Sequence, residues 1–205
     1  MSDLEKVLEL AKTAAKRFDL TGKTALVVGG NKGLGQSMAL ALASAGADVC
    51  IAGRGPDGLR ETADAIKVLG RRGSSFAADA SEERQVEDLV GYMVKTYGGI
   101  DILVTSQGIV HLEPTADLDI DAWQRVMDVN VKSLVLTCKH AGRIMLEKKK
   151  GKIINISSVR GFQGRAGDVA YAPSKGAVNQ LTRSLAIEWG PLGINVNGIA
   201  PVFTL

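Results

Sequence analysis

The chain has 205 residues, of which 45% are hydrophobic and 23% are charged, with 24 glycines and 5 prolines. This length and composition predict a compact α/β domain with a substantial core and exclude a disordered chain. The formal net charge of +3 is too small to argue for a nucleic-acid partner. No run approaches the ~18 apolar residues of a membrane span, so we expect no membrane insertion.

The chain begins with a stretch that predicts a helix over residues 2–17. Leu4, Val7, Leu8 and Ala11 form an apolar stripe, which we expect to pack on the domain or on a neighbouring subunit. Acidic residues are interspersed with the apolar ones, so this segment is not a signal peptide. Its polar face mixes both charges, which argues against a membrane-surface role.

The rest of the chain alternates short apolar runs with longer stretches of helical spacing. The predicted strands are 24–28, 48–52, 74–78, 100–104, 152–156 and 194–199. The predicted helices are 33–45, 57–69, 82–97, 121–149 and 173–189. Repeated strand–helix units predict an α/β fold with one doubly wound parallel sheet (Rossmann) and helices on both faces. We expect residues 1–20 to form an N-terminal extension and residues 21–205 to form the domain.

The two cysteines, Cys50 and Cys138, fall in a predicted strand and a predicted helix. With no Cys-x-x-Cys pair and only 2 histidines, the sequence predicts neither a disulfide framework nor a metal site. We therefore expect two buried thiols and a cytoplasmic protein.

A glycine-rich turn follows the first predicted strand and opens a helix. Its sequence is Gly29-Gly30-Asn31-Lys32-Gly33-Leu34-Gly35, with the spacing Gly-x-x-x-Gly-x-Gly. Glycines let the backbone turn tightly and approach a pyrophosphate, and the helix N-terminus offers free N–H groups. In this strand–turn–helix context the turn predicts dinucleotide binding.

The charges near this turn favour one form of the dinucleotide. A carboxylate after the second strand would bind the adenosine ribose hydroxyls and repel a 2′-phosphate. This chain instead has Arg54 there, with no acid until Asp57, and Lys32 lies within the glycine turn. We therefore expect NADP(H), with NAD(H) as the alternative if Arg54 is only a solvated loop residue.

A second motif is Tyr171-Ala-Pro-Ser-Lys175, which is preceded by Ser158 at the end of a predicted strand. On a helix, positions i and i+4 share a face, and a nearby ammonium lowers the pKa of a phenol. Tyr171 is then a proton donor or acceptor at neutral pH. The motif alone is common by chance, but the glycine turn and the strand-end serines place it in an oxidoreductase context.

These motifs together resemble the short-chain dehydrogenase/reductase family, from about residue 18 to residue 201. The resemblance implies that Ser158 holds the substrate oxygen, Tyr171 transfers the proton, and Lys175 binds the nicotinamide ribose. Asn130 matches the fourth catalytic position, which helps to hold a proton-relaying water. The cofactor contacts it implies are Gly29, Asn31, Lys32, Gly33, Leu34, Gly35, Arg54, Asp79, Ala80, Gly108, Tyr171, Lys175 and Pro201, with no metal.

The chain departs from the family pattern at several places. Val28 replaces a Thr before the glycine motif, and Val202 replaces a Gly after the sixth strand. Thr105-Ser106-Gln107 replaces Asn-Asn-Ala before Gly108, so Gln107 could crowd or contact the cofactor, while Thr105 could still bond the backbone. The sequence stops at Leu205, where relatives continue into a substrate-covering segment and a last strand, which this domain is expected to lack. His111 is either a structural residue or part of the pocket mouth.

The resemblance implies an oxidoreductase that interconverts a ketone and a secondary alcohol. Sugar acids or polyols, 3-oxoacyl thioesters and small ketones all stay open as substrates, and a non-enzymatic nucleotide-binding relative is the rival. Family members pair two long helices across a two-fold axis, which implies a homotetramer or homodimer built on helices 121–149 and 173–189. The apolar residues proposed for that interface are Val131, Leu134, Val135, Cys138, Ile144, Met145, Ala177, Val178, Leu181, Leu185 and Trp189.

Overall fold

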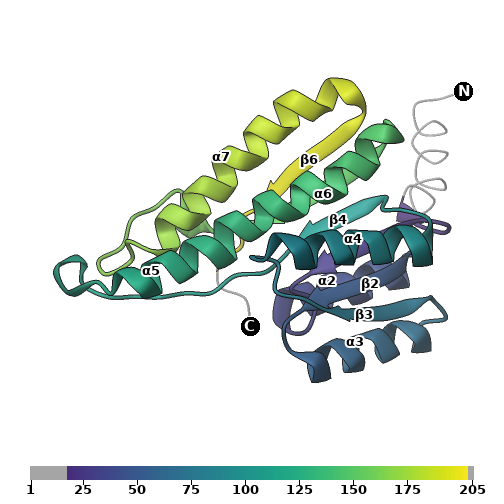
Figure 1. Ribbon diagram of the computed structural model, residues 1–205, viewed down its shortest axis with the longest axis horizontal. Helices are drawn as coiled ribbons and strands as arrows, with labels where there is room; N and C mark the ends of the chain where they lie inside the picture. The colour runs from purple at the N-terminus through teal and green to yellow at the C-terminus, as the bar shows by residue number, and fades with distance from the viewer. Residues whose placement is uncertain (1–17, 203–205) are drawn as a thin grey trace, which may run out of the picture.

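The computed structural model describes residues 18–202, whose six strands form a single sheet (Figure 1). The strands are β1 (Thr24–Val28), β2 (Asp48–Gly53), β3 (Gly73–Ala77), β4 (Ile102–Thr105), β5 (Gly151–Ile156) and β6 (Ile194–Ile199). They lie in the order β3-β2-β1-β4-β5-β6, and every neighbouring pair is parallel. The predicted doubly wound sheet is confirmed. The predicted helix over residues 2–17 lies outside the described residues.

The helices of the described chain connect these strands. They are α2 (Gly33–Ser44), α3 (Pro56–Val68), α4 (Glu83–Tyr97), α5 (Ile120–Met127), α6 (Ser133–Glu147) and α7 (Tyr171–Trp189). Three short 3₁₀ turns, η2 (Thr115–Asp117), η4 (Val159–Gly161) and η5 (Gly190–Leu192), were not predicted. None of the helices within residues 18–202 is both long and apolar enough to cross a bilayer.

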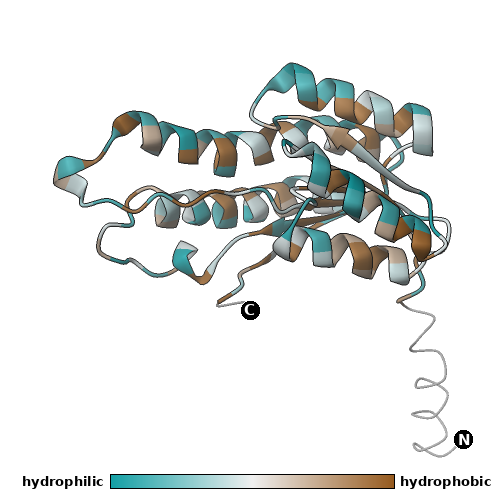
Figure 2. Cartoon of the chain, turned by 90° about the horizontal axis from the view of Figure 1, so that it is seen from below, coloured by the Kyte–Doolittle hydropathy of each residue, from teal (hydrophilic) through white to brown (hydrophobic). Residues whose placement is uncertain are grey.

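Side chains alternate between the two faces of the sheet, so each central strand serves two cores. Leu26 and Val28 of β1 pack with α4, α6 and α7, whereas Ala25 and Val27 pack with α2 and α3. A strand buried on both faces reads as a continuous apolar run, which is why β1 and β4 were easy to find. In Figure 2 the central strands are largely hydrophobic, while the helices carry hydrophilic residues on their outer sides.

The predicted helix 121–149 is wrong in one respect, because it is interrupted. The chain forms α5, then a π-helical turn η3 (Asp128–Lys132), and then α6. A π turn inserts one extra residue into a helix and often accompanies a functional residue. Here it carries Asn130, whose side chain leaves the helix to bond elsewhere in the fold.

The two cysteines are free and buried, as predicted. Burial raises the pKa of the Cys50 thiol to about 11 and that of Cys138 to about 12. Neither group offers a thiolate at neutral pH, so both behave as small apolar side chains.

The apolar residues proposed for a subunit interface lie mostly within the single chain. Leu134, Cys138, Met145, Val178 and Trp189 are buried against the sheet, and Ile144, Leu181 and Leu185 pack on the same core. The helices α6 and α7 therefore have fewer apolar residues available for a subunit interface than the sequence indicated. The exposed large ones on them are Val135 and Ile187.

Candidate active site

The sheet order reverses at β1 and β4, and in open parallel sheets ligands bind at the carboxyl ends of the strands at such a point. A pocket of about 600 Å³ lies there. Of the predicted site residues, it is lined by Gly29, Asn31, Lys32, Gly33, Leu34, Gly35, Arg54, Asp79, Ala80, Gly108, Ser158, Tyr171, Lys175 and Pro201. Asn130, the remaining predicted site residue, does not line the pocket but hydrogen-bonds to the backbone of Ile109, which does.

The glycine turn is built so tightly that two of its glycines admit no side chain. Gly29 has a φ of 84°, and a Cβ there would lie 2.6 Å from the backbone nitrogen of Gln107. A Cβ on Gly35 would lie 2.1 Å from the carbonyl oxygen of Gly29. The turn therefore packs against the loop after β4 and against the start of α2 at a distance that only glycine allows.

Helix α2 starts at this turn with its N–H groups uncapped. Lys32 occupies the N-cap position, and no side chain there accepts a hydrogen bond from the first turn. Uncapped N–H groups and the positive end of the helix dipole form an anion site. The residues present thus fit the pyrophosphate of a dinucleotide.

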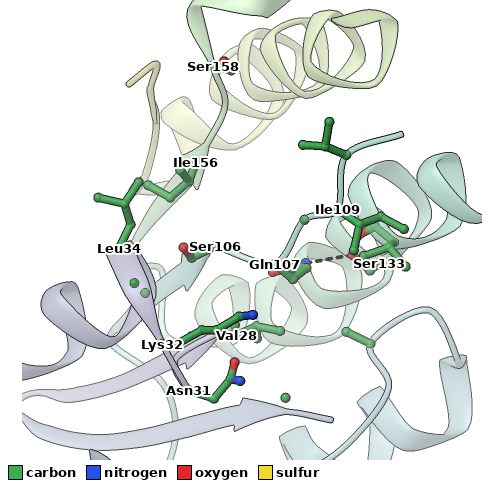
Figure 3. Close-up of a pocket in the computed structure, with 18 of the residues that line it drawn as sticks. Val28, Asn31, Lys32, Leu34, Ser106, Gln107, Ile109, Ser133, Ile156 and Ser158 are labelled. Carbon is green, nitrogen blue, oxygen red and sulfur yellow. Dashed lines mark hydrogen bonds between the residues drawn. The ribbon is translucent and has the colours of Figure 1, made fainter. Parts of the chain in front are cut away.

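Figure 3 shows Asn31 and Lys32 at one side of the pocket and Ser158 at the opposite side, after β5. The Oγ of Ser158 accepts a hydrogen bond of 3.2 Å from the backbone N–H of Arg160. Its own hydroxyl hydrogen has no acceptor among the described residues. Ser157, by contrast, donates to the carbonyl of Lys175 at 3.1 Å. Of the two adjacent hydroxyls, Ser158 is therefore the one free to donate to a ligand.

Tyr171 and Lys175 occupy the first two turns of α7, which begins two residues earlier than predicted. The Lys175 Nζ lies 5.7 Å from the centroid of the Tyr171 ring and donates to the carbonyl of Ile156 at 2.8 Å. Lys175 is 4% exposed, and this burial lowers its pKa to about 8. The Lys175 ammonium therefore lies over the face of the Tyr171 ring. The effect of this ammonium on the Tyr171 hydroxyl stays a prediction.

Asn130 has the partner that a buried amide requires, since it is 2% exposed. Its Oδ1 accepts from the N–H of Ile109 at 2.8 Å, and its Nδ2 donates to the Ile109 carbonyl and to Ser174 Oγ, both at 2.9 Å. A plain surface Asn is excluded. Asn130 fastens the loop after β4 to the helix that carries Tyr171 and Lys175.

At the other end of the pocket, Arg54 and Asp79 form a loose ion pair of 3.9 Å. Partial burial raises the pKa of Asp79, but hydrogen bonds from Ser81 and the attraction of Arg54 outweigh burial and hold the pKa below its usual value. The Asp79 Oδ1 accepts from the Ser81 N–H at 3.0 Å and from its hydroxyl at 2.7 Å. Asp79 thus shapes the turn after β3 and also lines the pocket.

The altered segment after β4 makes contacts that the sequence did not predict. Thr105 Oγ1 donates at 2.8 Å to the side chain of Asn155, which in turn donates to Thr182 Oγ1 at 3.0 Å. The expectation that Thr105 bonds the backbone is therefore wrong, because a buried side-chain acceptor on β5 lies opposite it. Gln107 lines the pocket and donates to Ser133.

His111 is not among the described residues that line the pocket, and its Nε2 lies 2.9 Å from the Glu113 carboxylate. The pocket has further walls that sequence reasoning missed. They include Ser106, Ile109, Val110, Val129, Ser133, Ile156 and Val202. Their positions beside the glycine turn, beside Asn130 and at strand ends were the available signals.

One group of potential metal ligands lies outside this pocket, where α4 meets α6. Ligand atoms of Glu83, Glu87 and His140 lie within 4.8 Å of one another. The Glu83 carboxylate already contacts both Lys139 and His140. The sequence did not predict this cluster, because the two helices are distant along the chain.

Comparison with known proteins identifies the fold and its class of chemistry. A family model described as short chain dehydrogenase matches residues 23–205. The chain belongs to the short-chain dehydrogenase family. It is an NAD(P)-dependent oxidoreductase of this family, and the predicted family resemblance is confirmed.

Among curated relatives, a 2-dehydro-3-deoxy-D-gluconate 5-dehydrogenase of Bacillus subtilis (strain 168) is 45% identical over 184 residues, covering 90% of this chain and 72% of the relative. A gluconate 5-dehydrogenase of Gluconobacter oxydans (strain 621H) is 34% identical, with 90% and 72% covered. Among solved structures, an NAD+-bound xylitol dehydrogenase superposes with a TM-score of 0.88 at 30% identity, covering 90% of this chain and 71% of that structure. The named relatives are dehydrogenases, which argues against a non-enzymatic role.

Proposed function

We propose that this short-chain dehydrogenase uses NADP(H) to interconvert a ketone and a secondary alcohol on a sugar-acid substrate. The observation that carries the reaction is that Ser158, Tyr171 and Lys175 line one pocket, in which Ser158 lies on the side opposite Asn31 and Lys32 (Figure 3). The other end of that pocket has the uncapped α2 N-terminus and the glycine turn.

Hydride transfer is the chemistry that a nicotinamide dinucleotide supplies when bound. In the reductive direction, the Ser158 hydroxyl donates a hydrogen bond to the substrate carbonyl oxygen. The Tyr171 hydroxyl gives that oxygen its proton, and the Lys175 ammonium stabilises the phenolate that results. In the oxidative direction the phenolate removes the alcohol proton. Asn130 holds the loop wall and α7 together while this occurs.

The substrate class is supported by the relatives rather than by the pocket. Two of them are named for dehydrogenation at carbon 5 of gluconate or of a deoxygluconate. The test is oxidation of gluconate and of polyols, and reduction of keto-sugar acids, acyl thioesters and simple ketones. Turnover of sugar acids above the other classes is expected. Turnover of none of these substrates with either nicotinamide cofactor would overturn the proposed function.

The preference for the phosphorylated cofactor rests on two cations at the adenosine end. Lys32 is exposed within the turn, and Arg54 is 59% exposed at the pocket edge. The Asp79 carboxylate competes for Arg54, but at 3.9 Å their pair is too long for a direct hydrogen bond. NAD(H) is the alternative, which the NAD+-bound xylitol dehydrogenase favours.

Replacing Arg54 by Asp is expected to shift the ratio of NADPH to NADH affinity toward NADH by tenfold or more. The change removes a charge-assisted contact of roughly 1.5–3 kcal/mol and adds repulsion toward the 2′-phosphate. Titration calorimetry with both cofactors measures the ratio. Arg60→Asp on α3 makes the same charge change outside the pocket and should leave the ratio unaltered. Equal affinity for the two cofactors in the unmodified protein would defeat the assignment.

Light scattering at micromolar concentration is expected to show a tetramer, or a dimer through α6 and α7. The family resemblance implies this isologous contact. The exposed Ile187 on α7 is an apolar side chain that such a contact would bury. Ile187→Asp should shift the assembly toward monomer, whereas Val68→Asp, on an exposed residue of α3, should not. A stable and active monomer of the unmodified chain would refute the bundle.

The cytoplasmic location expected from the two cysteines stays a prediction.

A further inference from the structure

Gln107 stands where the family pattern has a small Ala, in the loop directly after β4. It lines the dinucleotide pocket, and Figure 3 shows its side chain reaching across to Ser133. The Gln107 Nε2 donates to the Ser133 Oγ at 2.8 Å. Ser133 is the first residue of α6, immediately after the π turn. A side chain on the pocket wall is thus tied to the helix behind it.

The hydrogen bonds of Ser133 determine which way the Gln107 amide faces. The Ser133 hydroxyl donates its one hydrogen to the carbonyl of Val129, so its oxygen can only accept from Gln107. The Gln107 amide must therefore present its nitrogen to Ser133. Its Oε1 is left buried, with no hydrogen-bond partner among the described residues.

The unpartnered Oε1 offsets what the Nε2 hydrogen bond contributes to the stability of the unliganded fold. A buried acceptor without a partner costs at least as much free energy as one neutral hydrogen bond contributes. An apolar side chain of the same length would avoid that cost. We call the Gln107–Ser133 hydrogen bond the strap. The stability of the free protein does not explain the presence of this strap.

The strap holds in place the loop after β4, which forms one wall of the pocket. Asn130 fixes the backbone of Ile109 through two hydrogen bonds, and Gln107 ties the same wall two residues earlier. The wall also touches the glycine turn, because no Cβ fits between Gly29 and the Gln107 nitrogen. A wall that shifts at Gln107 must shift against the turn that receives the pyrophosphate.

We propose that Gln107 is a positioning residue, which acts through Ser133 to fix the pocket wall against the glycine turn for dinucleotide binding. This inference rests on the proposed dinucleotide function. It assigns to Gln107 a contribution to cofactor affinity that is made at the expense of the stability of the free protein.

Gln107→Met tests the proposal, since it keeps the side-chain length and removes both polar atoms. The melting temperature of the free protein should stay equal or rise. The Kd for the preferred cofactor should rise about five- to tenfold, as expected for one lost hydrogen bond that orders a binding surface. The kcat at saturating cofactor should stay within about twofold, because the strap does not touch the reacting groups.

Ser133→Ala removes the same strap from the other side and should weaken cofactor binding in the same way. The double variant should bind cofactor no more weakly than Gln107→Met alone, because the two changes remove one interaction. Gln180→Met, on the exposed side of α7, is the matched control and should change neither quantity.

Three results would overturn the proposal. An unchanged Kd in Gln107→Met would show that the strap does not position the site. A melting temperature that falls in step with affinity would show that Gln107 only supports the fold. If the unmodified protein binds neither NADPH nor NADH, both this inference and the proposed function fail, whereas normal binding by the unmodified protein confines a failure to Gln107.

Discussion

Tyr171→Phe is expected to lower kcat by about 100- to 10,000-fold, the range that a positioned general acid or base contributes. The substitution removes one oxygen from a half-buried ring at the start of α7 and leaves the packing intact. The Lys175 Nζ keeps its hydrogen bond to the Ile156 carbonyl, so the position of the Lys175 ammonium in the pocket is preserved. Cofactor affinity should therefore change far less than kcat, because Lys175, the main expected cofactor contact of the pair, is retained.

Steady-state kinetics with the preferred cofactor, together with calorimetric titration, separates these two quantities. Tyr92→Phe on α4 is the matched control, because its ring packs on Phe76 and does not line the pocket. That control should retain full activity. Near-normal turnover in Tyr171→Phe would remove Tyr171 from the mechanism, and a large rise in the cofactor Kd would assign it a binding role instead.

The fold was predictable because its signals are local. Apolar runs bounded by turn residues gave all six strands to within about two residues, and helical spacing gave the helices between them. The position of the pocket followed from topology, since the carboxyl ends of parallel strands meet at one edge. The pocket-lining positions of Ser158, Tyr171 and Lys175 therefore agree with the motifs.

The features that the sequence did not predict depend on contacts between residues distant along the chain. The π turn forms around Asn130, whose partners Ile109 and Ser174 lie 21 and 44 residues away. The Gln107–Ser133 bond spans 26 residues. Periodicity contains no information about such partners, so the long helix was expected to be continuous. For the same reason, the apolar residues of α6 and α7 could not be divided between the core and a possible interface.

Replacing Lys175 is expected to have the second large effect. Its buried ammonium lowers the stability of the folded protein, although the proposed reaction needs that charge. Its pKa falls to about 8 from 10.5 on folding, since burial disfavours the ammonium. Below pH 8 the folded protein must keep a buried charge that the unfolded chain holds in water. Between pH 8 and 10.5 the unfolded chain binds more protons than the folded protein, so stability rises with pH across this window.

Lys175→Met should therefore be more stable than the unmodified protein at pH 7 but nearly inactive. The gain is on the order of 2 kcal/mol, after allowing for the lost hydrogen bond to the Ile156 carbonyl. It should shrink as the pH rises from 8 toward 10.5, which urea unfolding at several pH values measures. The kcat should fall by about 100-fold or more as the ammonium is lost from the phenol, and the cofactor Kd should rise about tenfold. Lys95→Met, exposed on α4, is the control for removal of one positive charge. A loss of stability in Lys175→Met at pH 7 would show that the buried ammonium does not destabilise the fold. A change in only kcat or only the cofactor Kd would show that Lys175 does not serve both catalysis and cofactor binding.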